Sequence, residues 1–398
     1  MGRTPNRRVV VIVQNLPLRR DRRVRLECAA LVQAGYEVTA ICPRDMDSPD
    51  QSVAGVEVRH YKPPPSADGF VGYVVEFVYC WLATAALLAR DILRSGRPAV
   101  IQACNPPDTF WALAMWLKPF GTRFVYDQHD LNPEVYASRF ERPNPVLAKG
   151  LLLLERASYA VADEIIVTNA SYGSRATGRG RQPASIVSIV RSGPNRTMKR
   201  AAADPSLRRG RARLCCWIGV MGPQDGVDLL LHAIAHYVHV LGRDDCTFAL
   251  LGTGDSFDEL LALSEELKLG DHVVFAGWAD DALLGSYLST ADLGLSPDPK
   301  NPLNEVSTMN KVMEYMAYGI PVVAFDLTET RVSGGASLVY VTPDDTEAFA
   351  KAVAATLDDD DLRAQLGEMA RLRILVELCW EEQAPVYVNV FDRLVGDG

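Results

Sequence analysis

Several signals that mark common classes of protein are missing from this 398-residue sequence. None of its eight cysteines forms a CxxC pair, and most lie in apolar runs, where a free cysteine behaves as a small hydrophobic residue. Disulfide frameworks and zinc sites are therefore not expected, and a reducing compartment, the cytoplasm, is predicted. No GxGxxG follows the first apolar run, which argues against a dinucleotide oxidoreductase.

Positive charge is also in short supply. The sequence has 41 Lys and Arg against 50 Asp and Glu, which gives a formal net charge of −9. This balance argues against nucleic acid as a partner. The charge is uneven, because eight arginines lie within the first 25 residues beside one acid, Asp21. They form either a solvated tail and loop or a patch for the phosphates of a ligand or a membrane surface.

The longest apolar segment, GFVGYVVEFVYCWLATAALLA at 69–89, contains the charged residue Glu76. A charge inside a bilayer costs about 2.5 kcal/mol or more, which disfavours a spanning helix. Three interpretations stay open: a spanning helix, a buried core helix, and a helix that touches the membrane interface. The run VVVIV at 9–13 is too short for the core of a signal peptide.

Short β-branched runs alternate with helical patterns along the whole sequence. Such alternation predicts parallel sheets covered on both faces, and two sets of strands predict two doubly wound, Rossmann-like α/β domains. Helices are expected between the strands, for example at Arg22–Ala34, Asp228–Val240 and Lys311–Ala317. The expected strands are Val9–Val13, Glu37–Cys42, Ala99–Cys104, Arg123–Asp127, Glu164–Thr168, Ile186–Val190, Leu214–Val220, Thr247–Leu251, Val273–Ala276, Leu293–Ser296, Val322–Phe325 and Leu338–Val341.

A polar, charge-rich stretch near 196–213 marks the seam between the two halves. We expect an N-terminal domain over 1–196, a linker over 197–213 and a second domain over 214–375. A C-terminal helical segment over 376–398 is expected to cross back to the first domain. Ligands of open parallel sheets bind outside the carboxyl ends of the strands, so the loops that follow strands are the candidate site.

The segment EVSTMNKVMEYMAYGIPVV at 305–323 carries the strongest chemical signal. A helix is expected to begin around Ser307 or Thr308, where either side chain caps it and its free backbone N–H groups make an anion site. Lys311 lies one turn inside, where a cation suits a diphosphate. Glu314 shares a face with Lys311, and a carboxylate there suits the hydroxyls of a ribose. The alternative is a surface Lys–Glu pair on a capped helix.

The loop after the first expected strand is long and basic. It contains Arg20, Asp21, Arg22 and Arg23, and the helix that follows begins near Arg22. Guanidinium groups beside a helix N-terminus hold phosphate bidentately, so the donor diphosphate or an acceptor phosphate is the expected target. A mobile surface loop is the alternative.

His129 and Asp130 follow the expected strand that ends at Asp127. They therefore lie at its carboxyl end, where ligands bind. His129 is expected to hydrogen-bond a donor sugar, and Asp130 to orient that sugar or to accept a proton from an acceptor hydroxyl. A purely structural histidine is the alternative.

Taken together, these motifs resemble the retaining glycosyltransferases of family four, which have the GT-B fold. The resemblance covers nearly the whole chain and is most similar to the branch that builds bacterial surface polysaccharides and lipid-linked glycans. It rests on 310-NKVMEYMAYGIPVVAFD-326, 20-RDRRVRLEC-28, 126-YDQHDLNPE-134, 191-RSGPN-195, 217-WIGVMGPQDGVDLLL-231 and 252-GTGD-255.

The resemblance implies two domains that face each other across a cleft, with the nucleotide-sugar on the C-terminal domain and the acceptor on the N-terminal domain. It implies His129, Asp130 and Lys311 as catalytic residues. For Trp278, hydrophobic packing is the alternative to a contact with the nucleotide base. The implied donor-binding residues are Glu314, Glu305, Ser307, Thr308, Met309, Asn310, Arg191, Gly222, Gly252, Gly254 and Trp278.

The spacing of the two acidic residues departs from the family pattern. The family places seven residues between two glutamates, and counting back from Glu314 reaches Val306. The role of the first glutamate, a contact to the sugar, therefore passes to Glu305 or to the backbone N–H groups of 307–310.

A second departure concerns the diphosphate. Many relatives carry an arginine and a lysine where this chain has Val220 and Asp225. An aspartate cannot hold a diphosphate, so Arg191, Lys311 or an arginine of the N-terminal loop must replace the missing pair.

The resemblance implies transfer of a sugar, with retention, from a UDP-sugar or less readily a GDP-sugar to a hydroxyl of a glycan or a polyprenyl-linked acceptor. It implies no cofactor and no metal, in agreement with the lack of a convincing DxD pair. Peripheral contact with an anionic membrane, at the inner face of the plasma membrane, is expected through the basic N-terminal region and 69–89. The alternatives are a nucleotide-sugar 2-epimerase and a non-catalytic nucleotide-sugar-binding protein.

Overall fold

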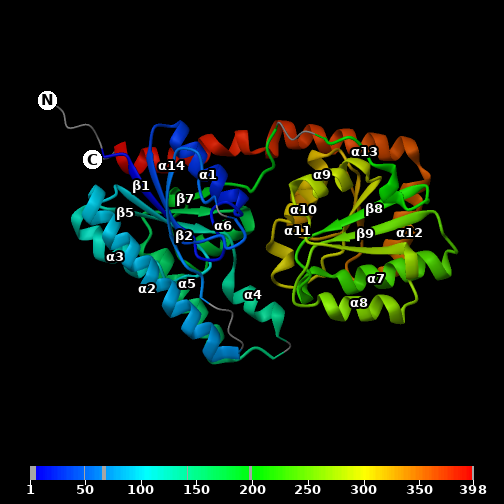
Figure 1. Cartoon of the computed structure of the whole chain (residues 1–398), viewed down its shortest axis with the longest axis horizontal. Coiled ribbons are helices and arrows are strands. Elements are labelled where there is room, and N and C mark those ends of the chain that lie inside the picture. The colour runs from blue at the N-terminus through cyan, green and yellow to red at the C-terminus, as the bar shows by residue number, and fades with distance from the viewer. Residues whose placement is uncertain (1–5, 49, 65–68, 141, 197–199, 397–398) are drawn as a thin grey trace. The chain divides into compact units, whose positions relative to one another are not determined.

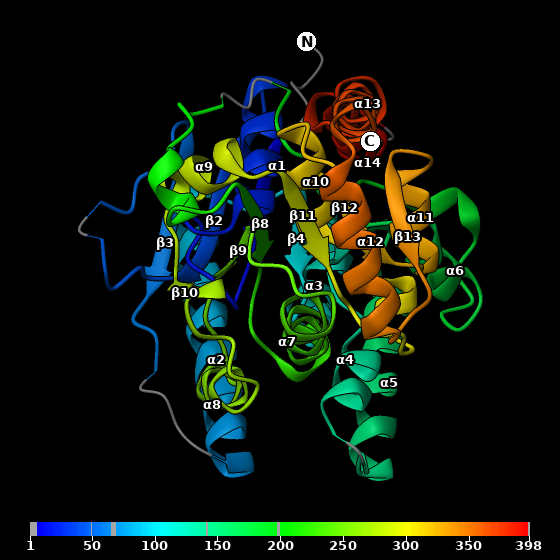
Figure 2. The same ribbon diagram turned by 90° about the vertical axis from the view of Figure 1, so that its right-hand side faces the viewer.

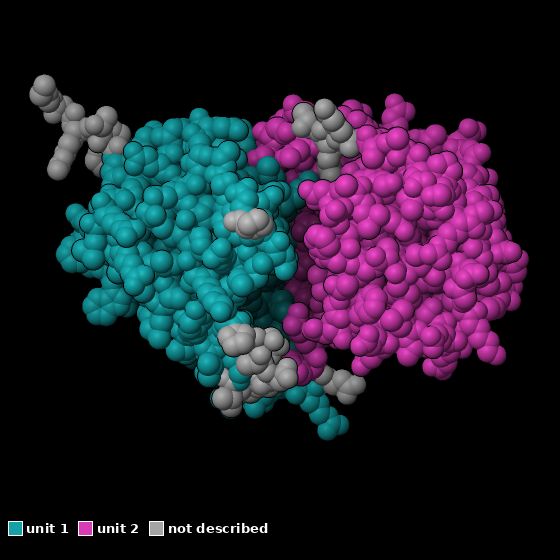
Figure 3. Space-filling model, viewed as in Figure 1, with its two compact units in different colours: residues 1–137, 142–192, 383–398 teal, residues 138–141, 193–382 magenta. Residues whose placement is uncertain are grey.

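The computed structural model of the chain describes residues 6–48, 50–64, 69–140, 142–196 and 200–396, without the side chains of 69–71 and 73. The chain divides into two compact units, coloured separately in Figure 3. Unit 1 comprises residues 1–137, 142–192 and 383–398, and unit 2 comprises 138–141 and 193–382. Residues 1–5 and 397–398 of the expected domains, and 197–199 of the expected linker, lie outside the described residues.

Unit 1 is built on a seven-stranded parallel sheet in the order β3-β2-β1-β4-β5-β6-β7 (Figure 1). The strand order reverses between β1 and β4, which is the switch point where doubly wound sheets bind ligands. Its strands are β1 (Arg8–Ile12), β2 (Glu37–Pro43), β3 (Val56–Tyr61), β4 (Val100–Cys104), β5 (Arg123–Gln128), β6 (Glu164–Val167) and β7 (Val187–Ile189).

The edge strand β3 was not expected from the sequence. Its residues, VEVRHY, mix charged and apolar side chains, and most of them are partly or fully exposed. Such a strand lacks the continuous apolar run that marks a buried parallel strand. The twelve expected strands are all confirmed, with bounds that differ by at most two residues.

Helices and short turns join the strands of unit 1. The helices are α1 (Arg22–Gln33), α2 (Gly69–Ser95), α3 (Trp111–Leu117), α4 (Asn132–Arg139), α5 (Pro145–Val161) and α6 (Ala170–Thr177). The short turns are η1 (Lys118–Phe120) and η2 (Ala184–Ile186).

The apolar segment 69–89 falls in α2, and only one stripe of this helix is covered. The buried stripe contains Cys80, Thr84, Leu88 and Asp91. Six large apolar side chains in the first half are exposed: Val74, Val75, Phe77, Val78, Tyr79 and Leu82. The interpretation of this segment as a wholly buried core helix is therefore wrong. None of the helices in the described part of the chain combines the length and apolar character that a membrane crossing requires.

Unit 2 is built on a six-stranded parallel sheet in the order β10-β9-β8-β11-β12-β13. Its switch point lies between β8 and β11, so the loops that follow these two strands are the candidate ligand loops. The strands are β8 (Arg213–Ile218), β9 (Cys246–Leu251), β10 (Val273–Gly277), β11 (Leu293–Ser296), β12 (Val322–Phe325) and β13 (Leu338–Val341).

Helices cover both faces of the second sheet, and Figure 2 shows α7 and α8 on one side and α9 and α10 on the other. The helices are α7 (Val227–Ala235), α8 (Phe257–Glu266), α9 (Asp281–Thr290), α10 (Asn310–Ala317), α11 (Thr328–Gly334), α12 (Thr346–Asp358), α13 (Asp360–Arg373) and α14 (Trp380–Gly396). Four 3₁₀ turns occur, η3 (Pro205–Arg208), η4 (Pro223–Asp225), η6 (Gly270–His272) and η7 (Asn304–Val306), together with two π-helical segments, η5 (His236–Val240) and η8 (Ile374–Leu378), in the described part of this unit.

Strand β8 shows how the second core is divided. Cys215 and Trp217 point into the cluster under α7, α8 and α12, whereas Leu214, Cys216 and Ile218 point into the cluster under α9, α10 and α13. This alternation follows from the two-residue period of a strand that is buried on both faces.

The last helix, α14, returns to unit 1 from Gln383 onward. Its Arg393 pairs with Glu164 of β6 at 2.6 Å, and the hydroxyl of Tyr36 donates to Asp392 at 2.7 Å. Tyr387 and Phe391 are fully buried within unit 1. The C-terminal residues are therefore part of the first core.

Candidate active site

A cluster of charged side chains lies toward the carboxyl ends of β4 and β5 in unit 1. Its cationic member is Arg23 of α1, whose guanidinium lies 2.9 Å from Glu27 Oε1 and 3.2 Å from Asp127 Oδ1. Both carboxylates are fully buried, and the Arg23 side chain is 9% exposed. Buried charges are tolerated when they are paired and hydrogen-bonded, so these three residues form one network.

Gln102 of β4 connects the two carboxylates. Its side-chain amide donates to Glu27 Oε2 at 2.9 Å and to Asp127 Oδ2 at 2.7 Å. Its carbonyl oxygen accepts a hydrogen bond from the hydroxyl of Tyr387 at 2.5 Å. One orientation of the amide satisfies all three neighbours, because its N–H groups must face the carboxylates.

His129, which follows β5, completes the cluster. Its Nε2 lies 2.9 Å from Asp127 Oδ2 and 3.0 Å from Arg23 Nε. Although burial opposes the charged ring, the Asp127 carboxylate raises the pKa of His129 above its ordinary value. This favours the form in which His129 Nε2–H donates to Asp127. The His129 side chain is 15% exposed, so part of the ring stays open to a ligand.

The two buried carboxylates differ in their ionisation. Burial, followed by the charge of Asp127, raises the pKa of Glu27 to about 8. Burial acts in the same direction on Asp127, but His129 and Arg23 outweigh it and hold the pKa of that carboxyl below its usual range. At neutral pH an ionised Asp127 therefore faces the imidazole beside a largely protonated Glu27.

Asn105, which follows β4, holds the backbone of the turn that carries both predicted residues. Its Oδ1 accepts from the N–H of His129 at 2.6 Å and from the N–H of Asp130 at 3.1 Å. Its Nδ2 donates to the carbonyl of Asp130 at 2.8 Å and to the Asp108 carboxylate at 2.9 Å. These bonds fix His129 and Asp130 at the carboxyl end of the sheet.

Two glycine-containing loops lie against each other at the carboxyl ends of β8 and β9 in unit 2. Gly252 has φ +146°, and a Cβ there would lie 1.8 Å from the carbonyl oxygen of Gly219. A Cβ at Gly254 would lie 2.5 Å from the carbonyl oxygen of Met221, whose N–H donates to the carbonyl of Thr253 at 3.0 Å. Backbone therefore touches backbone at this end of the sheet, and a larger residue does not fit.

Lys311 extends from the first turn of α10 toward the same loops. Its ammonium lies 2.6 Å from Asp298 Oδ1 and 5.1 Å from the centre of the Trp217 ring, and its side chain is 9% exposed. Asp298 also accepts a hydrogen bond from the Ser296 hydroxyl at 2.5 Å. Asp298 thus orients the ammonium through one N–H and leaves two others for a ligand.

Asp225 lies close to this ammonium, at a position where the family resemblance places a lysine. Its Oδ2 accepts from the backbone N–H of Gly222 at 3.1 Å, so the N–H of that predicted donor residue is already hydrogen-bonded. Burial, opposed by the charge of Lys311, raises the pKa of Asp225 to about 6. At pH 7 most of the carboxyl is ionised, so a diphosphate has to be held by other groups.

Helix α10 begins at Asn310, and its N-cap residue is Met309. The expectation that Ser307 or Thr308 is the N-cap is wrong, because Met309 holds that position and its side chain makes no capping hydrogen bond. The Ser307 hydroxyl instead donates to the carbonyl of Leu303, in the turn before the helix, at 2.8 Å. The first backbone N–H groups of a helix have no partner within the helix, and a methionine N-cap offers them no oxygen, so this end of α10 suits an anion.

Three further predicted donor residues lie in unit 2. Glu305 Oε1 accepts from the Thr328 hydroxyl at 2.5 Å. Glu314 lies on α10 one turn after Lys311 and is partly exposed. Trp278 follows β10 and is 69% exposed, so the alternative that it packs in the hydrophobic core is wrong.

The basic N-terminal loop is ion-paired within unit 1. Arg20 donates to Asp45 at 2.9 Å and to Asp47 at 2.6 Å, and these hydrogen bonds raise the pKa of Arg20. Asp21 is the N-cap of α1 and accepts from the Val24 N–H at 3.0 Å. A phosphate at Arg20 or at the buried Arg23 would therefore compete with carboxylates already in place.

The predicted residues are divided between the two units. The structure brings Arg23 to His129 in unit 1 and Lys311 to the glycine loops in unit 2. The group in unit 1 contains Arg20, Asp21, Arg22, Arg23, His129, Asp130 and Arg191, and the group in unit 2 contains Gly222, Gly252, Gly254, Trp278, Glu305, Ser307, Thr308, Met309, Asn310, Lys311 and Glu314.

Sequence reasoning missed Glu27, Gln102, Asn105 and Asp298. Signals for them were present, because Gln102 interrupts an apolar strand and Glu27 lies four residues after Arg23 on one helix. Asn105 and Asp298 follow expected strands, where ligand loops of parallel sheets lie.

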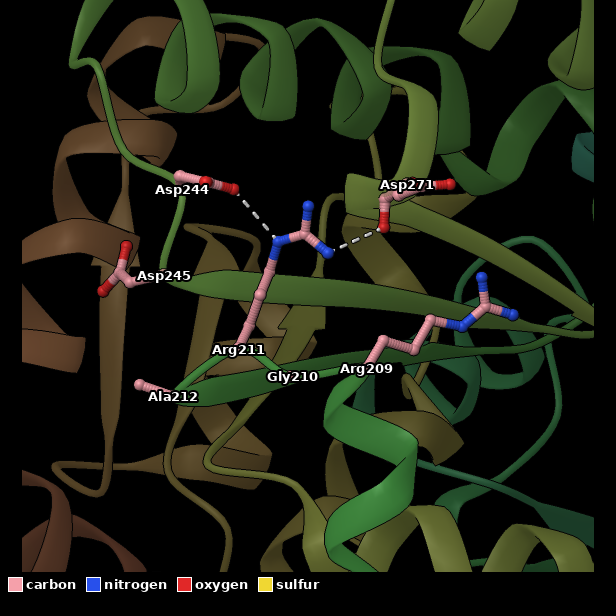
Figure 4. A pocket seen from close by; sticks show the side chains of 7 residues that line it. All are labelled: Arg209, Gly210, Arg211, Ala212, Asp244, Asp245 and Asp271. Atoms are coloured by element: carbon pink, nitrogen blue, oxygen red, sulfur yellow. Dashed lines mark hydrogen bonds and ion pairs between the residues drawn. The ribbon is translucent and has the colours of Figure 1, made fainter.

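A surface pocket of about 670 Å³ lies at the opposite, amino-terminal edge of the second sheet (Figure 4). Arg211 crosses it and bonds to Asp244 at 3.2 Å and to the carbonyl of Asp271 at 3.1 Å. Because the ligand loops leave the carboxyl ends of the strands, this pocket takes no part in the candidate site.

Glu27, Cys104, Asp127 and His129 each place a potential metal ligand within 4.8 Å of the others. The Arg23 guanidinium already lies within hydrogen-bonding distance of three of them. It supplies the positive charge that a metal ion would bring, so the cluster fits an ion-paired network better than a metal centre.

Comparisons with known proteins assign a glycosyltransferase family to each half of the chain. Residues 21–190 match the family described as a glycosyl transferase 4-like domain. Residues 212–359 match the family described as glycosyl transferases group 1. The two matches fall on the first and the second sheet respectively.

The chain is 25% identical to the D-inositol 3-phosphate glycosyltransferase of Thermobispora bispora, over 92% of this chain and 88% of that protein. The alignments with six other curated relatives span less than half of either chain.

Two solved structures show the same fold over both units. Sucrose-phosphate synthase from Thermosynechococcus elongatus has a TM-score of 0.80 at 18% identity, over 98% of this chain and 100% of that chain. Alr3699/HepE of Anabaena, in complex with UDP-glucose, has a TM-score of 0.70 at 15% identity, over 98% of each chain. The two family matches, the curated relatives and the paired doubly wound sheets lead to one conclusion: the chain belongs to the glycosyltransferases of family four, which have the GT-B fold.

Proposed function

We propose that this protein transfers a sugar, with retention of configuration, from a nucleotide-sugar to a hydroxyl of a glycan or a polyprenyl-linked acceptor in cell-envelope or exopolysaccharide synthesis. A UDP-sugar is the first candidate donor, and UDP-glucose is the ligand named for the Anabaena structure of the same fold. Curated relatives include a lipopolysaccharide core glycosyltransferase of Rhizobium meliloti, which supports an envelope glycan as the product class.

The observation that carries the proposal is the arrangement around Lys311 in unit 2. The uncapped N-terminus of α10, the ammonium of Lys311 and the backbone loops at Gly219 and Gly252 lie at the switch point of the second sheet. A helix N-terminus and a cation together suit the diphosphate of a nucleotide-sugar. Glu314, one turn deeper on α10, is the candidate partner for the ribose hydroxyls.

We assign the leaving diphosphate to Lys311 and the backbone N–H groups of α10. Negative charge on the diphosphate grows as the bond to the sugar breaks, and a fixed cation stabilises that charge. In a same-face displacement the departing diphosphate also helps to deprotonate the acceptor hydroxyl. His129 is assigned to the donor sugar, and Asp130 to the sugar or the acceptor proton.

A non-catalytic nucleotide-sugar-binding protein is the second candidate. Val220 and Asp225 stand where the family resemblance places an arginine and a lysine, and the pKa of Asp225 is about 6. An ionised Asp225 near the diphosphate weakens its binding, which favours this alternative.

The test of the proposal is thermal unfolding of the full chain with UDP, GDP, TDP, ADP and their common sugars, with and without EDTA. A stabilisation by UDP and UDP-sugars that EDTA leaves unchanged supports a UDP-sugar donor and metal-free binding. Stabilisation without nucleotide release in the presence of glycan acceptors favours the non-catalytic alternative. No stabilisation by any nucleotide contradicts both.

Peripheral membrane contact, at the inner face of the plasma membrane, belongs to the same proposal. The six exposed apolar side chains of α2 support it, whereas Arg20 is neutralised by Asp45 and Asp47. We therefore assign the contact to the apolar face of α2 first and to the arginines second. Co-sedimentation with vesicles of phosphatidylcholine, with and without phosphatidylglycerol, tests this assignment.

Pelleting that Val75→Asp and Leu82→Asp abolish supports the contact through α2, because both side chains are more than half exposed. Binding that these variants leave intact, or an absence of pelleting with either vesicle at low salt, overturns it.

A further inference from the structure

We propose that Gln102 and Tyr387 are positioning residues that fix the Asp127 carboxylate, and through it the imidazole of His129. This inference rests on the proposed function, in which His129 contacts the donor sugar. Gln102 lies on β4 and Tyr387 on the C-terminal helix α14, so both are far from His129 in the sequence.

The carboxylate of Asp127 is held from several sides. Its Oδ1 faces Arg23 Nη2 at 3.2 Å, and its Oδ2 faces His129 Nε2 at 2.9 Å and Gln102 Nε2 at 2.7 Å. The Cys104 thiol lies 3.6 Å from the same Oδ2. A carboxylate turns easily about its last torsion when unconstrained, so donors from three elements are what hold Oδ2 toward the histidine.

The side-chain amide of Gln102 acts as a donor in only one of its two orientations. Its amide is buried, and a half-turn would place its oxygen against the carboxylates of Glu27 and Asp127. The hydroxyl of Tyr387 donates to that oxygen at 2.5 Å and therefore holds the N–H groups toward the carboxylates. A chain of hydrogen bonds in a buried setting also strengthens each member, so the Tyr387 hydroxyl makes Gln102 a better donor.

The same protein contains a matched arrangement around Gln128, whose amide bonds to Glu155. The hydroxyl of Tyr159 donates to Gln128 Oε1 at 2.7 Å, and Gln128 Nε2 donates to Glu155 Oε1 at 3.2 Å. Glu155 pairs with Arg179 at 2.7 Å. Tyr159 and Tyr387 are both fully buried, so removal of either hydroxyl carries a similar structural cost.

Substitution of Gln102 has a definite electrostatic consequence for His129. The charged and titratable groups around the imidazole are Arg23 and Glu27 from α1, Cys104 from β4, Asp127 from β5 and, behind Gln102, Tyr387 from α14. The positive N–H end of the Gln102 amide points into this group. Its removal takes away an unfavourable dipole, but it also frees Oδ2 to turn from the ring, and the loss of that full negative charge outweighs the dipole, so Gln102→Leu lowers the pKa of His129.

The experiment is an NMR titration of the histidine side chains in the ligand-free full chain, with the His129 signal assigned from its loss in His129→Asn. We expect a fall of about half a pH unit in Gln102→Leu, a smaller fall in Tyr387→Phe, and no change in Tyr159→Phe. Thermal unfolding of each variant establishes that it is folded. Tyr387→Phe, which removes a single oxygen atom, keeps the test available if Gln102→Leu does not fold.

An unchanged or raised pKa of His129 in the folded variants overturns the inference, and so does an equal shift in Tyr159→Phe. The titration needs no substrate, so its outcome is separate from that of the proposed function. If His129→Asn retains full turnover while Gln102→Leu shifts the titration, the positioning network stands and the assignment of His129 to the donor sugar fails.

Discussion

The two units contain the same kind of parallel sheet, but their candidate sites consist of different chemical groups. In unit 1 the site is a network of side chains from α1, β4, β5 and α14, in which Arg23, Glu27, Asp127 and His129 are paired with one another. In unit 2 the site is mostly backbone, with glycine loops packed against each other and one ammonium, that of Lys311, beside the start of a helix.

This difference determines which substitutions each unit tolerates. A backbone site depends on the absence of side chains, so a single added methyl group is costly. A side-chain network depends on charge and orientation, so it responds to pH and to isosteric substitutions. Substitutions and changes of pH should separate these two behaviours.

The largest effect is expected for Gly252→Ala in unit 2. Its Cβ would lie 1.8 Å from the carbonyl oxygen of Gly219, and its φ of +146° is strained for a residue with a side chain. Because a backbone atom has to move, the free energy of unfolding should fall by about 3 kcal/mol or more. Gly285→Ala on α9, where a Cβ would meet only Tyr318 at 3.5 Å, is the control in urea unfolding. Equal stability of the two variants would show that the loops separate easily.

Lys311→Ala should have the second largest effect. It removes the cation assigned to the leaving diphosphate, so turnover should fall roughly a hundredfold, on the scale of a lost oxyanion donor. Lys351→Ala, on the exposed side of α12, should leave turnover unchanged. A Lys311→Ala enzyme with normal turnover, measured as nucleotide release from the donor found in the thermal screen, would remove this residue from the mechanism.

The buried Glu27 of unit 1 should make the free energy of unfolding depend on pH. Between the ordinary glutamate value of 4.5 and about 8, the folded protein retains the proton of Glu27 while the unfolded chain has released it. Stability is therefore lost as pH rises through this window, by at most about 1.4 kcal/mol per pH unit. His129, whose pKa is raised in the folded state, contributes a loss in the same direction.

Glu27→Gln should flatten that slope in urea unfolding between pH 5 and 8. The remaining slope comes from His129, from Glu155, whose pKa burial raises to about 7, and near pH 5 to 6 from Asp225 of unit 2, whose pKa burial raises to about 6. Glu57→Gln, at a half-exposed position of β3, is the control and should leave the slope intact. A slope that Glu27→Gln does not alter would mean that this carboxyl is ionised in the folded protein.

The smallest effect is expected for Glu314→Gln. This change weakens a contact to the ribose that is present in both the bound and the transition state, so the KM for the donor should rise about tenfold while kcat stays near its original value. Steady-state kinetics with varied donor measures this split. A fall in kcat at constant KM would place Glu314 in the chemical step instead.

The fold could be predicted from the sequence because its signals are local. Apolar runs such as Val322–Phe325 and the helical pattern at Lys311–Ala317 identify buried strands and helices from periodicity alone. The edge strand β3 escaped this reasoning because half-exposed residues carry no such run. The exposure of the first half of α2 could not be predicted, because the sequence of an apolar helix does not show whether another element covers it.

The sequence indicated candidate-site residues that follow a strand, as His129, Gly252 and Asp130 do, and residues in the first turn of a helix, as Arg23 and Lys311 are. The sequence by itself determined the order of strands and helices, the two doubly wound sheets and the loops that lie at their carboxyl ends. The tertiary structure alone decided that Tyr387 reaches Gln102, that Asp298 holds Lys311 and that Asp45 and Asp47 neutralise Arg20. These pairs join residues far apart in the chain, and burial and charge pairing depend on distance in space, which no local pattern records.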